Sequence, residues 1–241
     1  MRFYRRLRPI QALSFDLDDT LYSNQPIMLA TDKKMAAYFL RIFTELGVAN
    51  DSACFDFQFW WPFRQQALLE NPALKHDVGL LRQRCYYLGT LSLGVAEPVA
   101  ATIAEQGLRY FIEQRSNFTV PQQVHDLLAL LQSKVPLVAI TNGNVDTQRI
   151  GIAAYFSGHF HASMSNKLKP DADMFDKTCQ LLNIRPEQLL HVGDCGRNDV
   201  FGAINAGCQT AWLNRYTVGK PLQLVPSVML DNIEQLAQLF D

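Results

Sequence analysis

The stretch FDLDDTLY, residues 15–22, places three aspartates directly after a short apolar run. Like charges repel by about 4 kcal/mol at about 4 Å when the effective dielectric is near 20. Aspartate is also unfavourable in strands. Because the like charges repel, this cluster needs a positively charged partner. Hard carboxylate oxygens are the ligands that Mg²⁺ prefers. We therefore expect a cation beside Asp16 and Asp18, whereas the side chain of Asp19 should alternate away and do no chemistry.

Further polar side chains follow later apolar runs or the connections between them. They are Thr20 after the first run, Thr141 and Asn142 after PLVAI (136–140), Lys169 in SNKLKPD, and Asp194 and Asp199 after LLHV (189–192). Because the carboxyl ends of parallel strands meet at one edge of a sheet, we expect these side chains to converge on one pocket.

Several carboxylates and one lysine in a pocket indicate a site for a metal ion and a phosphate. We expect a metal held by Asp16 and Asp194, with Asp18 contributing a backbone carbonyl and Asp199 completing the acidic set. Lys169, the Thr141 hydroxyl and a backbone N–H near Asn142 would bind phosphate oxygens. Asp16 would attack phosphorus and form an aspartyl-phosphate, which water then hydrolyses. Asp18 would protonate the leaving group and later deprotonate the water.

The elements that must position these groups alternate from about residue 120 onward. Apolar runs typical of buried strands, ALSF, PLVAI, LLHV and TAWL, are separated by helical patterns at 121–132, 171–182 and 199–207. This alternation predicts an α/β fold with a Rossmann-like, doubly wound parallel sheet. Residues 23–118 instead show helical periodicity throughout. We expect an inserted all-helical cap at 23–118 and a catalytic core formed by 1–22 and 119–241.

Four segments in this order resemble the motifs of the haloacid dehalogenase-like superfamily. They are FDLDDTLY, the strand ending in Thr141-Asn142-Gly143, Lys169-Pro170-Asp171 and the run GDCGRND at 193–199. The resemblance covers about residues 10–215 and implies Asp16 as nucleophile, Asp18 as acid/base, Thr141 and Lys169 on phosphate, and Asp194 with Asp199 at Mg²⁺. The dehalogenase branch lacks the second aspartate, so Asp18 favours phosphoryl transfer.

The opening MRFYRRLRPIQALSFDLDDTLY and VPLVAITNGN are particularly similar to bacterial phosphatases acting on flavin mononucleotide and on 5-amino-6-(5-phosphoribitylamino)uracil. The resemblance thus implies a phosphomonoesterase of riboflavin biosynthesis. A phosphomutase, a 2-haloacid dehalogenase and a non-catalytic ligand-binding protein are the alternatives. Mn²⁺ or Co²⁺ are expected to substitute for Mg²⁺.

Each motif also has a purely structural interpretation. FDLDDT suits an acidic turn, and Asp194 and Asp199 suit a helix cap. Lys167 competes with Lys169 for the phosphate role. The aromatic stretch FDFQFWWPF (55–63) suits either the core of the cap or a surface that stacks on a substrate ring. None of the histidines is assigned to catalysis.

Composition narrows the class of partner. The chain has 22 basic and 23 acidic residues among 241, which gives no reason to expect nucleic acid or a membrane. The basic N-terminus lacks the apolar centre of a signal peptide. Five scattered cysteines without a CxxC pair favour a reducing, cytoplasmic setting. We expect a small phosphorylated metabolite as the partner of a monomer or small homo-oligomer.

Overall fold

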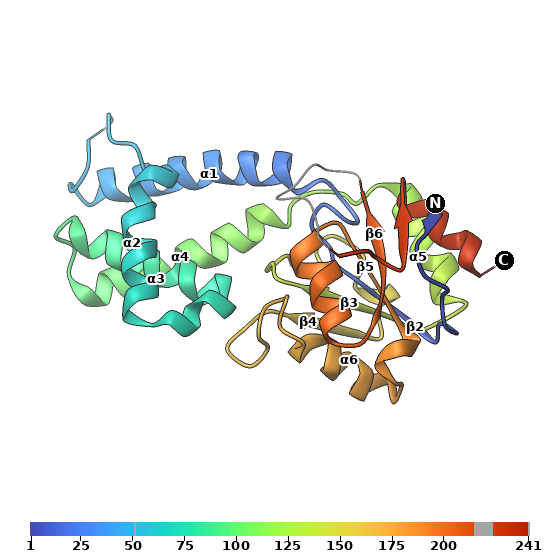
Figure 1. Ribbon diagram of the computed structural model, residues 1–241. Coiled ribbons are helices and arrows are strands. Elements are labelled where there is room, and N and C mark those ends of the chain that lie inside the picture. The colour runs from blue at the N-terminus through green and yellow to red at the C-terminus, as the bar shows by residue number, and fades with distance from the viewer. Residues whose placement is uncertain (51, 215–223, 241) are drawn as a thin grey trace. The chain divides into compact units, whose positions relative to one another are not determined.

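The computed structural model describes residues 1–50, 52–214 and 224–240. The chain divides into two compact units (Figure 1). One, the sheet unit, comprises Met1–Asn24, Thr119–Gly143 and Ile150–Asp241, and the other, the helical unit, comprises Gln25–Phe118 and Asn144–Arg149.

The sheet unit is built on seven strands among the described residues. They are β1 (Arg2–Phe3), β2 (Ala12–Phe15), β3 (Leu137–Thr141), β4 (Gly158–His161), β5 (Leu189–Gly193), β6 (Gln209–Leu213) and β7 (Val228–Leu230). Their order across the sheet is β1-β7-β6-β5-β2-β3-β4, and every neighbouring pair is parallel except β1 with β7. The predicted doubly wound parallel sheet is therefore confirmed, with β5 at its centre and β2 between β5 and β3.

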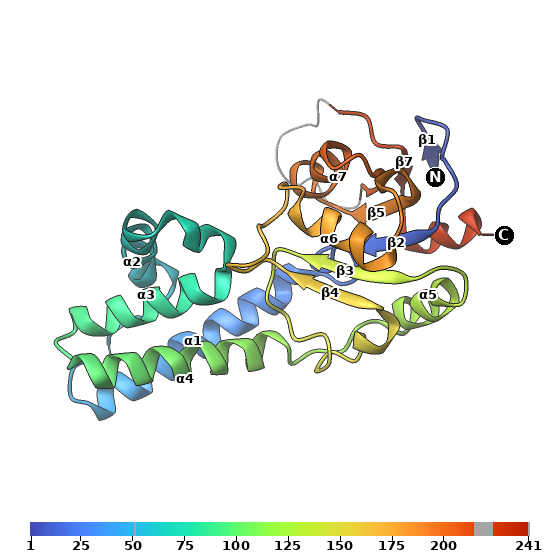
Figure 2. The ribbon, with the colours of Figure 1, turned by 90° about the horizontal axis from the view of Figure 1, so that it is seen from below.

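Helices cover both faces of this sheet (Figure 2). Right-handed crossovers place α6 (Asp173–Leu182) and α7 (Gly202–Asn205) on one face. Helix α5 (Gln122–Gln132) lies on the other face, against the 3₁₀ segment Ile233–Leu239. The central strands read as continuous apolar runs because they are buried on both faces: every residue of β2, β3 and β5 is buried.

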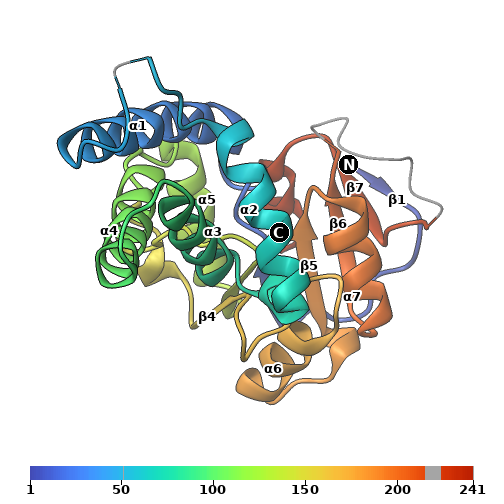
Figure 3. The same cartoon turned by 90° about the vertical axis from the view of Figure 1, so that its left-hand side faces the viewer.

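The helical unit contains α1 (Asn24–Glu45), which starts at the end of the sheet unit, and α2 (Phe57–Glu70), α3 (Val78–Ser92) and α4 (Glu97–Arg115) (Figure 3). A short 3₁₀ segment, Pro72–His76, joins α2 to α3. Phe39 and Phe43 of α1, Tyr86 of α3 and Phe111 of α4 form its buried aromatic core. Helices α2 and α3 approach closely, since a Cβ atom at Gly89 would lie 2.5 Å from the Trp60 ring.

Three strands were not predicted from the sequence, namely β1, β4 and β7. Strands β1 and β4 lie at the two edges of the sheet, and none of the three has more than four residues. In β4, the sequence GHFH lacks the apolar run that marks a buried strand. Within the described ranges, every helix falls short of the combination of length and apolar character that a membrane crossing requires.

Candidate active site

Three adjacent strands bring the predicted site residues to one edge of the sheet. Asp16 directly follows β2, Thr141 ends β3, and Asp194 directly follows β5. The Asp16 N–H still bonds to the Val192 carbonyl at 2.9 Å, so strand pairing with β5 holds the Asp16 backbone in place. A short, fully buried strand on each side of β2 thus fixes where these polar groups emerge.

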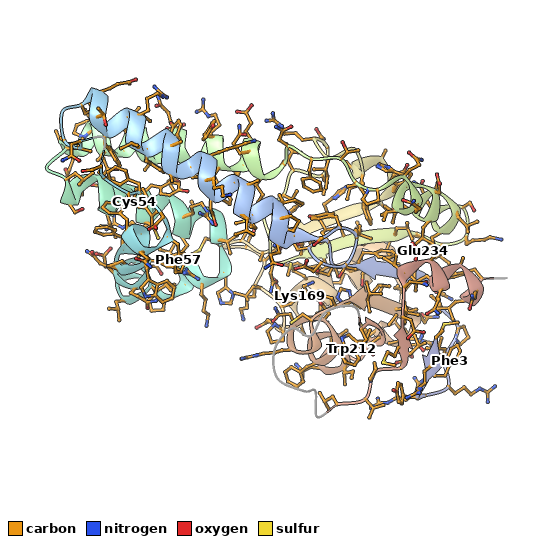
Figure 4. The ribbon with its side chains drawn as sticks, turned by 90° about the horizontal axis from the view of Figure 1, so that it is seen from above. Phe3, Cys54, Phe57, Lys169, Trp212 and Glu234 are labelled. Carbon is orange, nitrogen blue, oxygen red and sulfur yellow. The ribbon has the colours of Figure 1, made fainter. Side chains whose placement is uncertain are left out.

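Lys169, which Figure 4 labels, brings its ammonium to two carboxylates of this cluster. Its Nζ donates to Asp16 Oδ1, to Asp199 Oδ1 and to the Ile140 carbonyl, each at 2.7 Å. The side chain is 1% exposed, whereas that of Lys167 is 63% exposed and lies 3.8 Å from Asp171. The structure therefore places Lys169, and not Lys167, beside Asp16.

Asn142 holds the Lys169 segment from the neighbouring strand end. The Lys169 N–H donates to Asn142 Oδ1 at 2.8 Å, and the Asn142 amide donates to the Lys169 carbonyl at 2.9 Å. The Thr141 hydroxyl accepts from the Gly143 N–H at 3.0 Å. Asn142 thus contributes to the site by fixing Lys169, a role that motif reading did not separate from substrate contact.

The charges of this cluster depend on one another. Burial alone would lower the pKa of Lys169, but the carboxylates of Asp16 and Asp199 raise it above its ordinary value. Burial raises the pKa of Asp16, and the neighbouring Asp199 and Asp18 raise it further against the opposing pull of Lys169. Burial also acts to raise the pKa of Asp199, yet Lys169 and His191 hold it below the usual range. Asp199 and Lys169 therefore form an ionised pair, and the single lysine leaves the charges of Asp16 and Asp194 incompletely compensated.

A second cation would supply that compensation. Carboxylate oxygens of Asp16, Asp194 and Asp199 lie within 4.8 Å of one another, a donor set that suits Mg²⁺. Burial, followed by Asp199 and Asp19, raises the pKa of Asp194 to about 7. The oxygens of Asp199 already accept from Lys169, His191 and the Cys195 N–H. Asp16 and Asp194 therefore have more capacity to bind a metal than Asp199 has.

The remaining predicted residues lie around these carboxylates. Thr20 Oγ1 is 3.3 Å from Asp16 Oδ2 and 3.4 Å from Asp194 Oδ1. The carboxylate of Asp18 lies outside the three-carboxylate group and accepts from the Tyr22 hydroxyl at 2.8 Å. A metal contact of Asp18 through its backbone carbonyl stays a prediction.

The Asp19 carboxylate makes a structural hydrogen bond at the start of α1. The φ of Asp19 is 59°, and its carboxylate accepts the N–H of Asn24, the first residue of α1, at 2.8 Å. An aspartate tolerates this left-handed conformation better than most residues.

A buried hydrogen-bonded chain behind the site was missed by sequence reasoning. Ser14 on β2 and His191 on β5 are register partners, and Ser14 Oγ lies 2.9 Å from His191 Nδ1. His191 Nε2 lies 3.3 Å from Asp199 Oδ1. Burial lowers the pKa of His191. In the neutral tautomer with the proton on Nε2, the ring would donate to Asp199 and accept the Ser14 hydroxyl at Nδ1. The chain fixes the carboxylate that holds Lys169.

Comparison with known proteins identifies consistent similarities. A sequence model of the haloacid dehalogenase-like hydrolases matches residues 10–207. The chain is 37% identical over 234 residues to the 5-amino-6-(5-phospho-D-ribitylamino)uracil phosphatase YigB of Escherichia coli K12, covering 97% of this chain and 95% of that protein. It is 31% identical over 131 residues to the N-acylneuraminate-9-phosphatase of Rattus norvegicus, covering 51% and 52% of the two chains.

Among solved structures, the 2-haloacid dehalogenase from Pseudomonas syringae pv. Tomato DC3000 matches with a TM-score of 0.87 at 26% identity. This match covers 95% of this chain and 97% of that one. The similarity therefore extends over both the sheet unit and the helical unit.

Proposed function

Because the chain belongs to the haloacid dehalogenase-like hydrolases and is a phosphatase, we propose that it hydrolyses a small phosphate ester with the help of Mg²⁺. The proposed substrate is 5-amino-6-(5-phospho-D-ribitylamino)uracil, with flavin mononucleotide as a second candidate. The observation that supports this choice is the 37% identity to YigB over nearly the whole chain. We place the reaction in the cytoplasm as a step of riboflavin biosynthesis.

In the proposed reaction, Asp16 is the nucleophile. One of its carboxylate oxygens forms a bond to phosphorus as the bond from phosphorus to the ester oxygen breaks. Asp18 gives its proton to that leaving oxygen, then takes a proton from the water that attacks the aspartyl-phosphate. Inorganic phosphate leaves, and Asp16 is restored. The hydrogen bond from Tyr22 holds the Asp18 carboxylate in one orientation.

Lys169 acts on this reaction by charge and position. Its three N–H donors are all used, on Asp16, Asp199 and the Ile140 carbonyl. It therefore orients Asp16 before the substrate arrives, and a direct bond to phosphate requires one of these contacts to be exchanged. The Thr141 hydroxyl and backbone N–H groups near Asn142 are the other phosphate ligands.

Mg²⁺, when bound by Asp16 and Asp194, supplies positive charge against the phosphate oxygens. Asp199 supports the site from behind by holding Lys169. The helical segment 23–118 is proposed as a cap that limits the access of water.

The proposed function is tested by phosphate release. Purified protein is mixed with Mg²⁺ and, separately, with the ribitylaminouracil phosphate, flavin mononucleotide, a sugar phosphate and a nucleoside monophosphate. We expect the two ring-bearing ribityl phosphates to give the highest kcat/KM. Comparable rates on all four esters would contradict the substrate assignment, and no release from any would contradict the phosphatase assignment. Release that requires an added bisphosphate would indicate a phosphomutase.

Dehalogenation is a second candidate because of the close structural match to a 2-haloacid dehalogenase. Asp18 argues against it, since the dehalogenase branch lacks this aspartate. Chloride release from 2-chloropropionate, measured beside phosphate release, decides between the two activities.

A further inference from the structure

His161 ends β4 at the same edge of the sheet as the proposed active site. It is the register partner of Thr141, the last residue of β3, and the Ala162 N–H donates to the Thr141 carbonyl at 2.9 Å. The His161 side chain is half-buried, and the proposed catalytic steps give it no role. A histidine therefore lies in the strand next to a residue proposed to bind phosphate.

The His161 ring contacts the turn that follows β3. Its Nδ1 lies 3.2 Å from the Gly143 carbonyl oxygen. A carbonyl oxygen only accepts hydrogen bonds, so Nδ1 must carry the proton and donate it. The neutral ring then has no proton on Nε2. The partner thus determines which of the two ring nitrogens holds the turn.

Gly143 is held through both of its peptide groups. Its N–H donates to the Thr141 hydroxyl at 3.0 Å, and its carbonyl accepts from His161. Glycine has more backbone freedom than any other residue, so these two bonds restrict the turn where it would otherwise be most variable. The sheet unit is interrupted directly after Gly143, since Asn144 belongs to the helical unit. His161 therefore fixes the turn at the point where the chain leaves the sheet unit.

The position of Gly143 bears on the Thr141 hydroxyl. This hydroxyl has one proton to donate and accepts the Gly143 N–H with a lone pair. Its own proton is therefore directed elsewhere and can be given to a phosphate oxygen. The hydrogen bond from His161 acts on the direction of this proton through one residue, Gly143.

The backbone of His161 is held independently of its ring. Its carbonyl accepts from the Asn166 side-chain amide at 3.0 Å, and Asn166 Oδ1 in turn accepts from Lys177 of α6 at 2.9 Å. Pairing of β4 with β3 fixes the same residue from the other side. Replacement of the ring should therefore remove the contact to Gly143 and leave the end of β4 in place.

We propose that His161 is a positioning residue for phosphate, which holds the turn at 141–143 by donating from Nδ1 to the Gly143 carbonyl. In this arrangement the Thr141 hydroxyl and the backbone N–H groups near Asn142 are directed at the phosphate oxygens before the ligand arrives. The inference rests on the proposed function and adds a residue to the same site.

Binding of inorganic phosphate, the product of the proposed reaction, tests this inference without turnover. The full-length protein is titrated by calorimetry in the presence of Mg²⁺. His161→Leu removes the donor, and we expect it to weaken phosphate binding about tenfold or more, as for the loss of one hydrogen bond to a charged group. His161→Asn carries an N–H as many bonds from the backbone as Nδ1 and should recover most of the affinity. The amide nitrogen of His161→Gln corresponds to Nε2 instead, so this variant should bind as weakly as His161→Leu.

His159→Leu is the matched control. His159 lies two residues earlier on β4, on the same face of the strand, and its ring packs on Phe156 with centroids 5.5 Å apart. This variant should bind phosphate as the wild type does, and melting curves check that every variant is folded. In turnover of an aryl phosphate, His161→Leu should raise KM about tenfold and change kcat less, because the lost contacts also bind the ground state.

Equal phosphate affinity in the wild type and His161→Leu would overturn the inference, as would recovery by glutamine and not by asparagine. Absence of saturable phosphate binding by the wild type would overturn it too. Phosphate release from the ribitylaminouracil phosphate by the wild type reports on the proposed function separately. Release with unchanged phosphate affinity in every variant rejects only the role of His161. Phosphate binding that depends on His161, without release from any ester, rejects only the phosphatase proposal.

Discussion

Replacement of Lys169 by methionine removes the charge at the centre of the site while keeping a side chain of similar length. In the native chain the ammonium contacts two buried carboxylates and one carbonyl, each at 2.7 Å. Loss of one partner from a buried ion pair costs about 3–5 kcal/mol. We expect Lys169→Met to lower the free energy of unfolding of the metal-free protein by about this amount near neutral pH.

The cost should depend on pH in a defined direction. Without Lys169 the pKa of Asp16 rises further, so the folded variant holds a proton that the unfolded chain releases above its ordinary pKa. The variant's deficit relative to wild type therefore shrinks as pH falls and grows as pH rises. Phosphate release should fall by about 100-fold or more, as for other losses of preorganised charge at a reacting centre.

Urea unfolding followed by circular dichroism, with EDTA present, measures the stability change at about pH 5 and about pH 8. Lys167→Met is the matched control, since Lys167 is exposed and only 3.8 Å from Asp171, a contact worth about 0–1 kcal/mol. Equal stabilities of the two variants at both pH values would refute the central role given to Lys169.

Three further predictions concern neighbouring residues. Asp18→Asn should lower kcat by at least about 100-fold. Asp19→Asn should keep its activity, because asparagine retains the acceptor for the Asn24 N–H and tolerates a φ of 59°. Equal loss of activity in both variants would contradict the assignment of Asp18. His191→Leu should lower the free energy of unfolding by about 1–3 kcal/mol and should lower kcat. His191→Gln should lose less stability and less kcat than His191→Leu. A native kcat in the leucine variant would contradict a role of His191 in positioning Asp199. In metal-free protein, the folded pKa of Asp194 is about 7 against 3.8 unfolded, so its stabilising contribution falls as pH rises from about 4 to 7; thermal melting in EDTA should show this slope reduced in Asp194→Asn, and an unchanged slope would contradict it.

The sequence predicted the convergence of Asp16, Thr141 and Asp194 because each stands at the end of an apolar run. The carboxyl ends of parallel strands lie at the same edge of a sheet, so the last residue of each apolar run is enough to place these side chains at that edge. The position of Lys169 directly before Pro170, as in the family segment, favours it over Lys167. Only the structure shows that Lys169 is buried and that all of its donors are used.

Features that depend on strand register and turn geometry were beyond sequence reasoning. The Ser14–His191 contact exists because β2 and β5 pair at those two residues, and no local pattern reports that register. The Tyr22–Asp18 hydrogen bond depends in the same way on the turn after β2. Which aromatic rings of 55–63 are buried and which are exposed depends on how α2 packs on α3, and the sequence does not show this packing.

The central claim is that Asp16 attacks phosphorus. Protein mixed with a ring-bearing ribityl phosphate and Mg²⁺ is quenched in acid, digested and analysed by mass spectrometry, with Asp16→Asn in parallel. We predict one phosphoryl group on the peptide that contains Asp16 in wild type, and neither phosphoryl peptide nor phosphate release in the variant. Full phosphate release by a folded Asp16→Asn protein, or a phosphoryl group on another residue, would contradict the account.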